Sequence, residues 1–201
     1  MLNTPKMKYS VELASDSPQA WVDTVLADFD SFLQDHADCE RKASAMAMNM
    51  VARYSDRLEI IPELIETALE ELEHFRDVYE IMQKRGVELP KVMEKDPYIT
   101  QLMQEAKGGD ANSRFLTHLL LGSVIECRGC ERFRLVSEQL EDEELSRFYK
   151  ILWAVEAKHG NIYVEMALNY FDKDLVYGKL DELMQKEAKI VANLPLRAAL
   201  H

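Results

Sequence analysis

Apolar residues recur every three or four positions along most of the chain, which is the spacing of one face of an α-helix. The pattern predicts a first helix over about 17–54, with Ser17 as N-cap and Pro18 as the first helical residue. A second helix is expected to open at Pro62 and to end at "KRG", where Gly86 suits the residue that follows a helix. No segment has the two-residue period of a strand.

The second half of the chain repeats this arrangement. The pattern predicts a third helix from about Asp110, a fourth over about 142–170 and a fifth over about 174–192. Residues 87–110 are expected to be irregular, with one short helix after Pro97. We therefore expect a single all-α domain over the whole chain, with four long helices in two hairpins, a long crossover between them and an additional C-terminal helix.

Four carboxylates and two imidazoles interrupt the apolar stripes of the four long helices. They are Glu40, Glu71 and His74 in the first predicted hairpin and Glu126, Glu156 and His159 in the second. In each hairpin a Glu is followed by a Glu-x-x-His motif, 31 residues later in the first and 30 residues later in the second. Glu126 lies 14 residues before Leu140 and Glu156 lies 14 after Asp142, so these two are level across the turn. In the first hairpin, Glu40 lies 14 residues before Tyr54 and Glu71 lies 10 after Ile61, a difference of about one helical turn that a longer turn absorbs.

Buried, unpaired carboxylates cost several kcal/mol or more, and four of them together would repel one another. Two divalent cations would neutralise four carboxylates, and Glu and His at i and i+3 can reach the same ion. This is the ligand set of the ferritin-like di-iron and di-manganese proteins. We expect Glu71 and Glu156 to bridge the two ions and Glu40 and Glu126 to be terminal ligands. The alternative for any one position is a local salt bridge or a narrow exposed edge.

Several neighbours of these residues are weaker candidates. His36, one turn before Glu40, is interpreted as a core histidine in preference to a partner of the site. Tyr163 is interpreted as aromatic core. Cys127 and Cys130 form a C-x-x-C, but no second pair completes a zinc site, so both are expected to be buried helix residues.

The segment "CRGCERF" offers Glu131 as a rival to Glu126. Glu131 lies only 25 residues before Glu156, however, and its side chain is rotated away from the apolar stripe that carries Glu126. The spacing therefore predicts that Glu131 is a surface acid, free to pair with Arg128 or Arg134.

Composition narrows the functional classes. The chain has 201 residues, a net charge of −12 and three cysteines. The acidic balance argues against indiscriminate binding of nucleic acid, although it allows a local basic patch. No apolar run is long enough for a membrane span, and no signal peptide is evident, so a cytoplasmic protein that does not enter membranes is expected.

Four segments, "DHADCERKASAMAMNM", "ALEELEHFRDVYEIM", "LLGSVIECRGCERF" and "LWAVEAKHGNIYVEMA", resemble the tRNA 2-methylthio-N6-isopentenyladenosine hydroxylase family. The similarity extends over nearly the whole chain, and the words D-C-E-R-K-A and C-E-R-F are its most specific parts. The resemblance implies a non-haem di-iron monooxygenase that uses dioxygen and two electrons to hydroxylate the isopentenyl group of a modified adenosine in tRNA. The family's metal ligands would map onto the same six residues, with iron, or manganese as an alternative, and with no catalytic side chain beyond the ligands.

The partners implied are tRNA, dioxygen and an unidentified electron donor, for a monomer or small homo-oligomer. Five basic residues near the ligands are candidates for RNA contact: Arg41, Lys42, Arg128, Arg132 and Arg134. Two other functions stay open from the residues alone. One is a ferritin-like protein that stores iron or consumes peroxide, and the other is a di-iron hydroxylase of a lipid or quinone.

Overall fold

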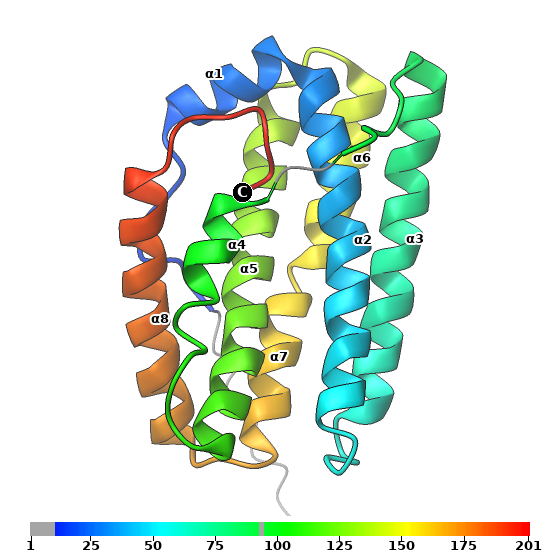
Figure 1. The fold of residues 1–201 in the computed structure, drawn as a ribbon. Coiled ribbons are helices and arrows are strands. Elements are labelled where there is room, and N and C mark those ends of the chain that lie inside the picture. Colours follow the sequence, from blue (N-terminus) through cyan, green and yellow to red (C-terminus); the bar gives the residue numbers. More distant parts are fainter. Residues whose placement is uncertain (1–10, 93–94) are drawn as a thin grey trace, which may run out of the picture.

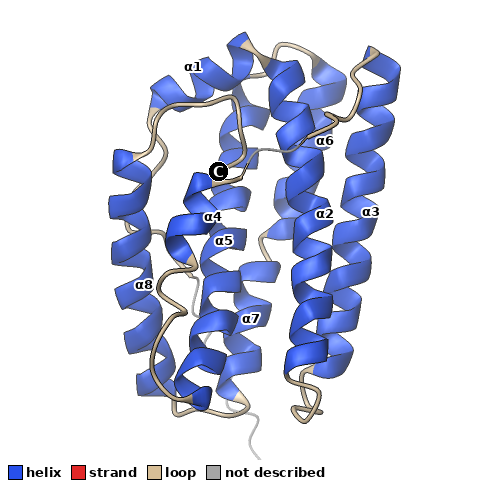
Figure 2. Cartoon of the chain, in the orientation of Figure 1, coloured by secondary structure: helices blue, strands red, loops and turns tan. Residues whose placement is uncertain are grey.

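The computed structural model describes residues 11–92 and 95–201. Within these ranges the chain forms eight α-helices and no strand (Figures 1 and 2). The helices are α1 (Gln19–Ala27), α2 (Phe29–Arg53), α3 (Ile61–Arg85), α4 (Pro97–Leu102), α5 (Ala111–Gln139), α6 (Glu143–Glu156), α7 (His159–Leu168) and α8 (Lys173–Asn193). The predicted all-α class is confirmed.

The long helices pair as the sequence predicts. Helix α2 packs against α3 in the first hairpin, and α5 packs against both α6 and α7 in the second. The crossover between the hairpins carries the short helix α4, which packs on α8, and α8 in turn covers a side of α5 that the hairpin leaves free (Figure 1). The result is a four-helix bundle of the ferritin type with an additional C-terminal helix.

The first predicted helix is interrupted at Asp28. That residue has φ −140° and ψ 64°, and its side chain accepts a hydrogen bond from the backbone N–H of Ser31, so it caps α2. Pro18 takes the N-cap position of α1 that was expected for Ser17. The hydroxyl of Ser17 instead donates to Glu131 at 2.8 Å.

The fourth predicted helix is also interrupted, and the interruption falls inside its Glu-x-x-His motif. Helix α6 ends at Glu156 and α7 begins at His159. Ala157 and Lys158 keep right-handed helical dihedral angles, but the Lys158 N–H bonds to the Val155 carbonyl, a tighter pattern than that of an α-helix. The axis can therefore continue while the register of the hydrogen bonds changes at the candidate site.

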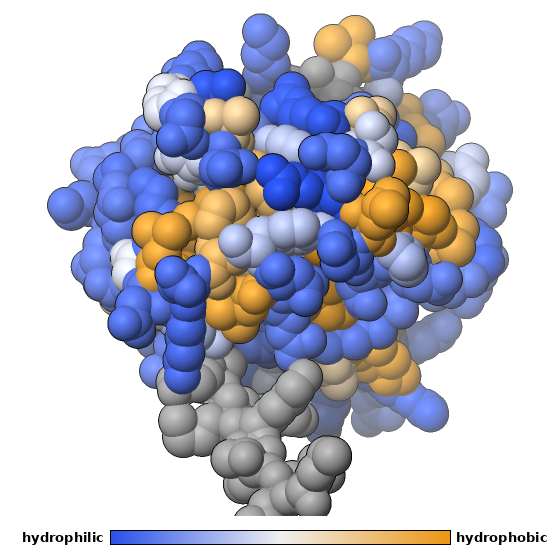
Figure 3. All heavy atoms as spheres, turned by 90° about the horizontal axis from the view of Figure 1, so that it is seen from below, coloured by the Kyte–Doolittle hydropathy of each residue, from blue (hydrophilic) through white to orange (hydrophobic). Residues whose placement is uncertain are grey.

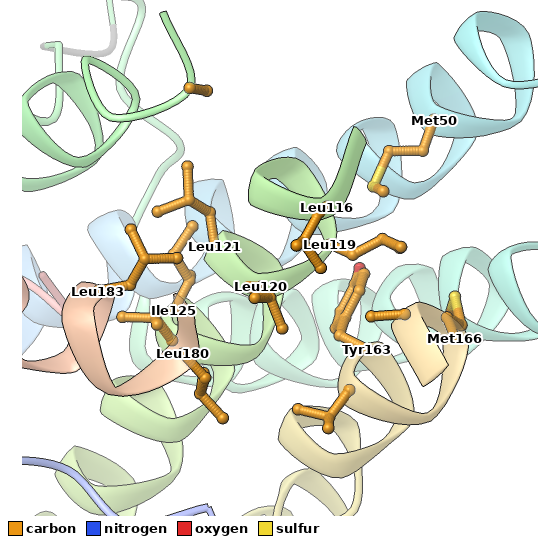
Figure 4. Close-up of a cluster of buried hydrophobic side chains, with 14 of the residues drawn as sticks. Met50, Leu116, Leu119, Leu120, Leu121, Ile125, Tyr163, Met166, Leu180 and Leu183 are labelled. Atoms are coloured by element: carbon orange, nitrogen blue, oxygen red, sulfur yellow. The ribbon is translucent and has the colours of Figure 1, made fainter. Parts of the chain in front are cut away.

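Helix α5 lies at the centre of the main hydrophobic cluster. Its Leu116, Leu119, Leu120 and Leu121 pack against residues of α2, α7 and α8 (Figure 4). Gly122 lets the ring of Tyr163 approach closely, because a Cβ at this position would lie 2.8 Å from two ring carbons. Burial on several sides makes α5 a helix without a clear solvent face.

A buried ion pair docks α8 on α5. The guanidinium of Arg128 donates to both carboxylate oxygens of Glu187, at 2.7 and 2.9 Å, and neither side chain is exposed. The same guanidinium donates to Glu131 at 3.1 Å. A buried pair of this kind fixes the position of one helix on another, because removing one partner leaves an uncompensated charge.

The chain after α8 returns over the bundle and ends beside α4, where Figure 1 marks the C-terminus. Trp21 donates to the carbonyl of Ala199 at 3.1 Å, and Arg132 donates to that of Leu200 at 2.6 Å. Polar and apolar side chains are mixed on the end of the bundle seen in Figure 3. Among the described residues, no helix is both long enough and apolar enough to cross a membrane.

Candidate metal centre

The structure brings the six residues of the repeated pattern together in the middle of the bundle. Glu40 comes from α2, Glu126 comes from α5, and α3 carries both members of the first Glu-x-x-His motif. The second motif spans the junction of α6 and α7. The carboxylates are at most 9% exposed, His159 is fully buried and the side chain of His74 is 11% exposed.

Two overlapping groups of donor atoms form within this cluster. Glu40 and His74 define one group, and Glu126 and His159 define the other. Glu71 and Glu156 belong to both groups, and within each group the donor atoms lie within 4.8 Å of one another. The two carboxylates shared by both groups are the two that are expected to bridge a pair of ions.

The donor atoms approach one another without making satisfactory hydrogen bonds. Nδ1 of His159 lies 2.6 Å from a Glu156 oxygen and 2.9 Å from a Glu71 oxygen, and Nδ1 of His74 lies 2.6 Å from the other Glu156 oxygen. Both nitrogens and these three oxygens are buried and have no partner in hydrogen-bonding geometry. Lone pairs that converge in this way fit one or more metal ions, and the mixed carboxylate and imidazole set suits iron or manganese.

The electrostatics of the cluster agree with this fit. Burial, together with the charges of Glu71 and Glu156, raises the pKa of both Glu40 and Glu126 well above the usual range. Burial alone would lower the imidazole pKa values. The contacts with Glu156 and Glu71 outweigh it, so the pKa of His74 rises to about 10 and that of His159 to about 12. Protons balance the carboxylates in the metal-free cluster, and metal binding must displace them.

Each end of the centre is held by an outer hydrogen bond. The imidazole of His159 directs Nδ1 at the cluster while its Nε2 lies 2.7 Å from Glu70, which also binds Lys158 at 2.8 Å. A carboxylate behind a ligand histidine fixes its ring orientation. Glu70 is not among the residues predicted from the sequence, although its position next to Glu71 was a usable signal.

At the other end, His36 lies behind Glu40. Its Nε2 is 2.6 Å from the Glu40 carboxylate and its Nδ1 is 3.0 Å from the hydroxyl of Tyr149. His36 is fully buried, as expected for a core histidine. It also contacts a candidate ligand directly, so the less favoured alternative, a partner of the site, holds as well.

The remaining neighbours of the site are placed as follows. Tyr163 is fully buried, as predicted, and its hydroxyl has no hydrogen-bond partner. Cys127 and Cys130 are partly buried free thiols that line a hollow reaching Glu156. Burial raises the pKa of both thiols to about 12, so neither is an activated nucleophile.

A largely apolar pocket of about 310 Å³ leads to the candidate metal centre. Glu40, Glu126 and Glu156 form its inner end. Its apolar walls include Met46, Ile99, Met103, Ile125, Phe133 and Leu200. Cys39, Lys42, Asp96 and His201 are its other polar lining residues. We call this space the apolar pocket.

The structure corrects two predictions about the outer face of α5. Glu131 is 9% exposed, accepting hydrogen bonds from Ser17 and Arg128, and so is no surface acid. Arg128 is fully buried and Arg132 is 4% exposed, so neither presents its guanidinium to an RNA surface. The N-terminal segment and α8 cover this face. Arg134 has 33% of its side chain exposed and pairs with Glu138.

The two basic residues beside Glu40 are exposed to solvent, unlike Arg128 and Arg132. The side chains of Arg41 and Lys42 are 52% and 42% exposed, and both pair with Asp38. Lys42 also lines the apolar pocket. These two residues can face a ligand that approaches the pocket from solvent.

The bundle and its six inward-pointing side chains define a ferritin-like protein with a candidate carboxylate–histidine metal site. Over residues 5–201 the chain matches the family described as tRNA-(MS2IO6A)-hydroxylase (MiaE), and it belongs to that family. The family prediction and the prediction of a hydroxylase are thereby confirmed.

Two curated relatives carry the same name, tRNA 2-(methylsulfanyl)-N(6)-isopentenyladenosine(37) hydroxylase. The relative from Pseudomonas putida is 37% identical over 161 residues, which cover 80% of this chain and 77% of the relative. The relative from Salmonella typhimurium is 30% identical over 117 residues, or 58% of this chain and 42% of the relative. A solved protein from Synechococcus with aldehyde deformylating oxygenase activity superposes with a TM-score of 0.88 at 31% identity, over 94% of each chain.

Proposed function

We propose that the protein binds two iron ions and hydroxylates the isopentenyl group of 2-methylthio-N6-isopentenyladenosine in tRNA, with dioxygen and two electrons. Family membership supports the reaction and the substrate. The observation that carries the proposal is the apolar pocket, because its inner end is formed by three carboxylates of the candidate metal centre. An apolar group bound in it would have its C–H bonds next to the metal ions.

The two overlapping groups of donor atoms suggest which residues would bind each metal ion. Glu71 and Glu156 would bridge, while His74 and Glu40 would bind one ion and His159 and Glu126 the other. Bound iron supplies the activation of dioxygen that an unactivated C–H bond requires and that side chains lack. Glu70 and His36 hold the ligands in place from outside, and manganese is the alternative metal for the same donors.

The apolar pocket binds and orients the substrate. Its volume of about 310 Å³ lies at the lower end of the range for small-ligand sites, which suits a short branched hydrocarbon better than a long chain. Apolar walls also exclude water from the reacting carbon, which limits side reactions.

The tRNA is proposed to approach over Arg41 and Lys42. The net charge of −12 repels phosphate overall, so binding needs a local cationic surface near the pocket. Arg134 is a more distant candidate on α5.

A tRNA substrate also supports the cytoplasmic location expected from the sequence. The electron donor is a separate partner, and a monomer or small homo-oligomer is expected.

Mass spectrometry of tRNA nucleosides from cells with and without the protein tests this function. The hydroxylated isopentenyl nucleoside should disappear in the deletion strain while its unhydroxylated precursor accumulates. Cells that make the precursor and still hydroxylate it normally without the protein would refute the proposal.

A second candidate is oxidation of a small apolar aldehyde or lipid-like compound. The likeness to the Synechococcus protein with aldehyde deformylating oxygenase activity favours it. The two functions can be distinguished by incubating the iron-loaded protein, dioxygen and a chemical reductant either with an aldehyde or with precursor-containing tRNA. Turnover of the aldehyde without any hydroxylation of precursor-containing tRNA would favour this candidate.

A further inference from the structure

Three potential metal ligands from separate segments meet in the lining of the apolar pocket. Cys39 lies on α2, Asp96 precedes α4, and His201 is at the end of the described chain. We propose that these residues form a mononuclear site for a zinc-type divalent cation, separate from the candidate metal centre. Their donor atoms lie within 4.8 Å of one another, and none of the three belongs to the six residues of that centre.

Two of the three distances between the donor atoms are close to those around a tetrahedral ion. Sγ of Cys39 lies 3.6 Å from Nδ1 of His201, and that nitrogen lies 3.7 Å from Oδ2 of Asp96. With zinc bonds of about 2.3 Å to sulfur and about 2.0 to 2.1 Å to nitrogen or oxygen, tetrahedral geometry separates such ligands by about 3.3 to 3.6 Å. An ion between the three atoms would therefore need only small movements of the side chains.

The imidazole of His201 makes only one weak side-chain hydrogen bond, with a thiol, although its side chain is only 5% exposed. Nε2 has no partner of normal geometry, although the backbone of Ile125 lies near the ring. Nδ1 meets only the thiol of Cys39 and the distant carboxylate of Asp96. Nδ1 is thus engaged only by the two groups proposed as its co-ligands, so an ion between them would replace a weak thiol contact and displace no strong hydrogen bond.

Neighbouring groups already hold the Asp96 carboxylate and the His201 imidazole in position. Oδ1 of Asp96 accepts hydrogen bonds from the backbone N–H groups of Tyr98 and Ile99, at 2.7 and 3.2 Å, which leaves Oδ2 directed at His201. The rings of His201 and Tyr98 stack with centroids 4.9 Å apart and planes 5° apart. This second set of contacts fixes the orientation of both the carboxylate and the imidazole, as outer partners do at metal sites.

Asp35 ties the same cluster to the returning chain. Its Oδ2 accepts from the backbone N–H of Leu200 at 2.7 Å and lies 3.6 Å from Sγ of Cys39. A bound ion would join α2, the start of α4 and the C-terminal segment around the apolar pocket. With three protein ligands, a fourth position is left for water or another small ligand.

The site differs chemically from the candidate metal centre, whose six ligands contain no sulfur. A thiolate favours zinc-type ions, whereas a carboxylate-rich cluster favours harder ones. Cobalt(II) is a suitable probe, because a bond between cobalt and thiolate gives a near-ultraviolet charge-transfer band. Only a cysteine ligand produces that band, and because Cys127 and Cys130 line a hollow that reaches Glu156, cysteine variants are needed to assign the band to Cys39.

The test is a cobalt(II) titration of the metal-free full chain, kept reduced. Wild type should show the thiolate band and bind about one ion more per chain than Cys39→Ser, which should lose the band. His201→Gln should weaken cobalt binding at this site at least tenfold. Cys130→Ser, which removes a partly buried thiol outside the cluster, should keep the band.

Circular dichroism of each variant checks that the helices persist. His201→Gln keeps the test decisive if Cys39→Ser does not fold, because it leaves the thiol in place. Three results would overturn the proposal: no thiolate band in wild type, a band that survives in Cys39→Ser, or unchanged cobalt affinity in folded His201→Gln.

Discussion

The ion pair between Arg128 and Glu187 gives a quantitative test of how α8 is held. Replacing Glu187 with Ala removes three charge-assisted hydrogen bonds, two from Arg128 and one from Tyr98, and leaves a guanidinium that is fully buried. Breaking one partner of a buried pair costs about 3 to 5 kcal/mol. Glu131 still accepts a hydrogen bond from Arg128 at 3.1 Å, so we expect the lower end, about 3 kcal/mol.

Thermal and urea unfolding of the metal-free protein measure this loss without a contribution from metal binding. For a chain of this size, a loss of about 3 kcal/mol lowers Tm by about 6 to 12 °C. The exposed pair between Arg134 and Glu138 provides the control, and Glu138→Ala should cost less than about 1 kcal/mol. If Glu187→Ala is no more destabilising than Glu138→Ala, the pair does not anchor α8.

Three further predictions concern packing, the outer face of α5 and the tRNA surface. Gly122→Ala should lower the free energy of unfolding by about 1 to 3 kcal/mol, because the added Cβ would clash with Tyr163. Gly178→Ala, in α8 with open space around it, should raise the free energy of unfolding by up to about 1 kcal/mol, and urea unfolding measures both. Glu131→Ala should cost about 1 to 3 kcal/mol and leave the metal content of the purified protein unchanged, since its contacts are structural. Metal loss in that variant would contradict this role. Lys42→Glu should raise the apparent KM for tRNA, and more so at low salt; equal KM values there would exclude this residue from the tRNA surface.

Periodicity was sufficient to predict the helices and the meeting of the six site residues. A helix converts sequence spacing into depth and direction, so two Glu residues about thirty positions apart in a hairpin can be placed level from their spacing alone. The interruptions of the first and fourth predicted helices were harder to predict from the sequence. Asp28 is a good capping residue that the continuous apolar stripe concealed. The change at Ala157 and Lys158 alters hydrogen bonding but not the helical dihedral angles, so it leaves no signal in the spacing.

The errors at Glu131, Arg128 and Arg132 share one cause. Helical spacing identifies the most apolar face of a helix, but it does not reveal what packs on the other faces. In this protein α8 and the segment before α1 cover the second side of α5. Glu187 and the Ser17 hydroxyl accept hydrogen bonds from Arg128, and the same hydroxyl donates to Glu131. Charged residues on a helix face therefore indicate solvent only when no other element lies over that face.

The most direct test of the account is a single-turnover reaction of iron-loaded protein with precursor-containing tRNA, a chemical reductant and ¹⁸O-labelled dioxygen. We expect one ¹⁸O atom in the hydroxylated isopentenyl group with wild type. We expect no hydroxylation with Glu156→Ala, since that side chain reaches both groups of donor atoms. Oxygen derived from water, or normal hydroxylation by Glu156→Ala, would contradict the assignment of these residues to an oxygen-activating metal centre.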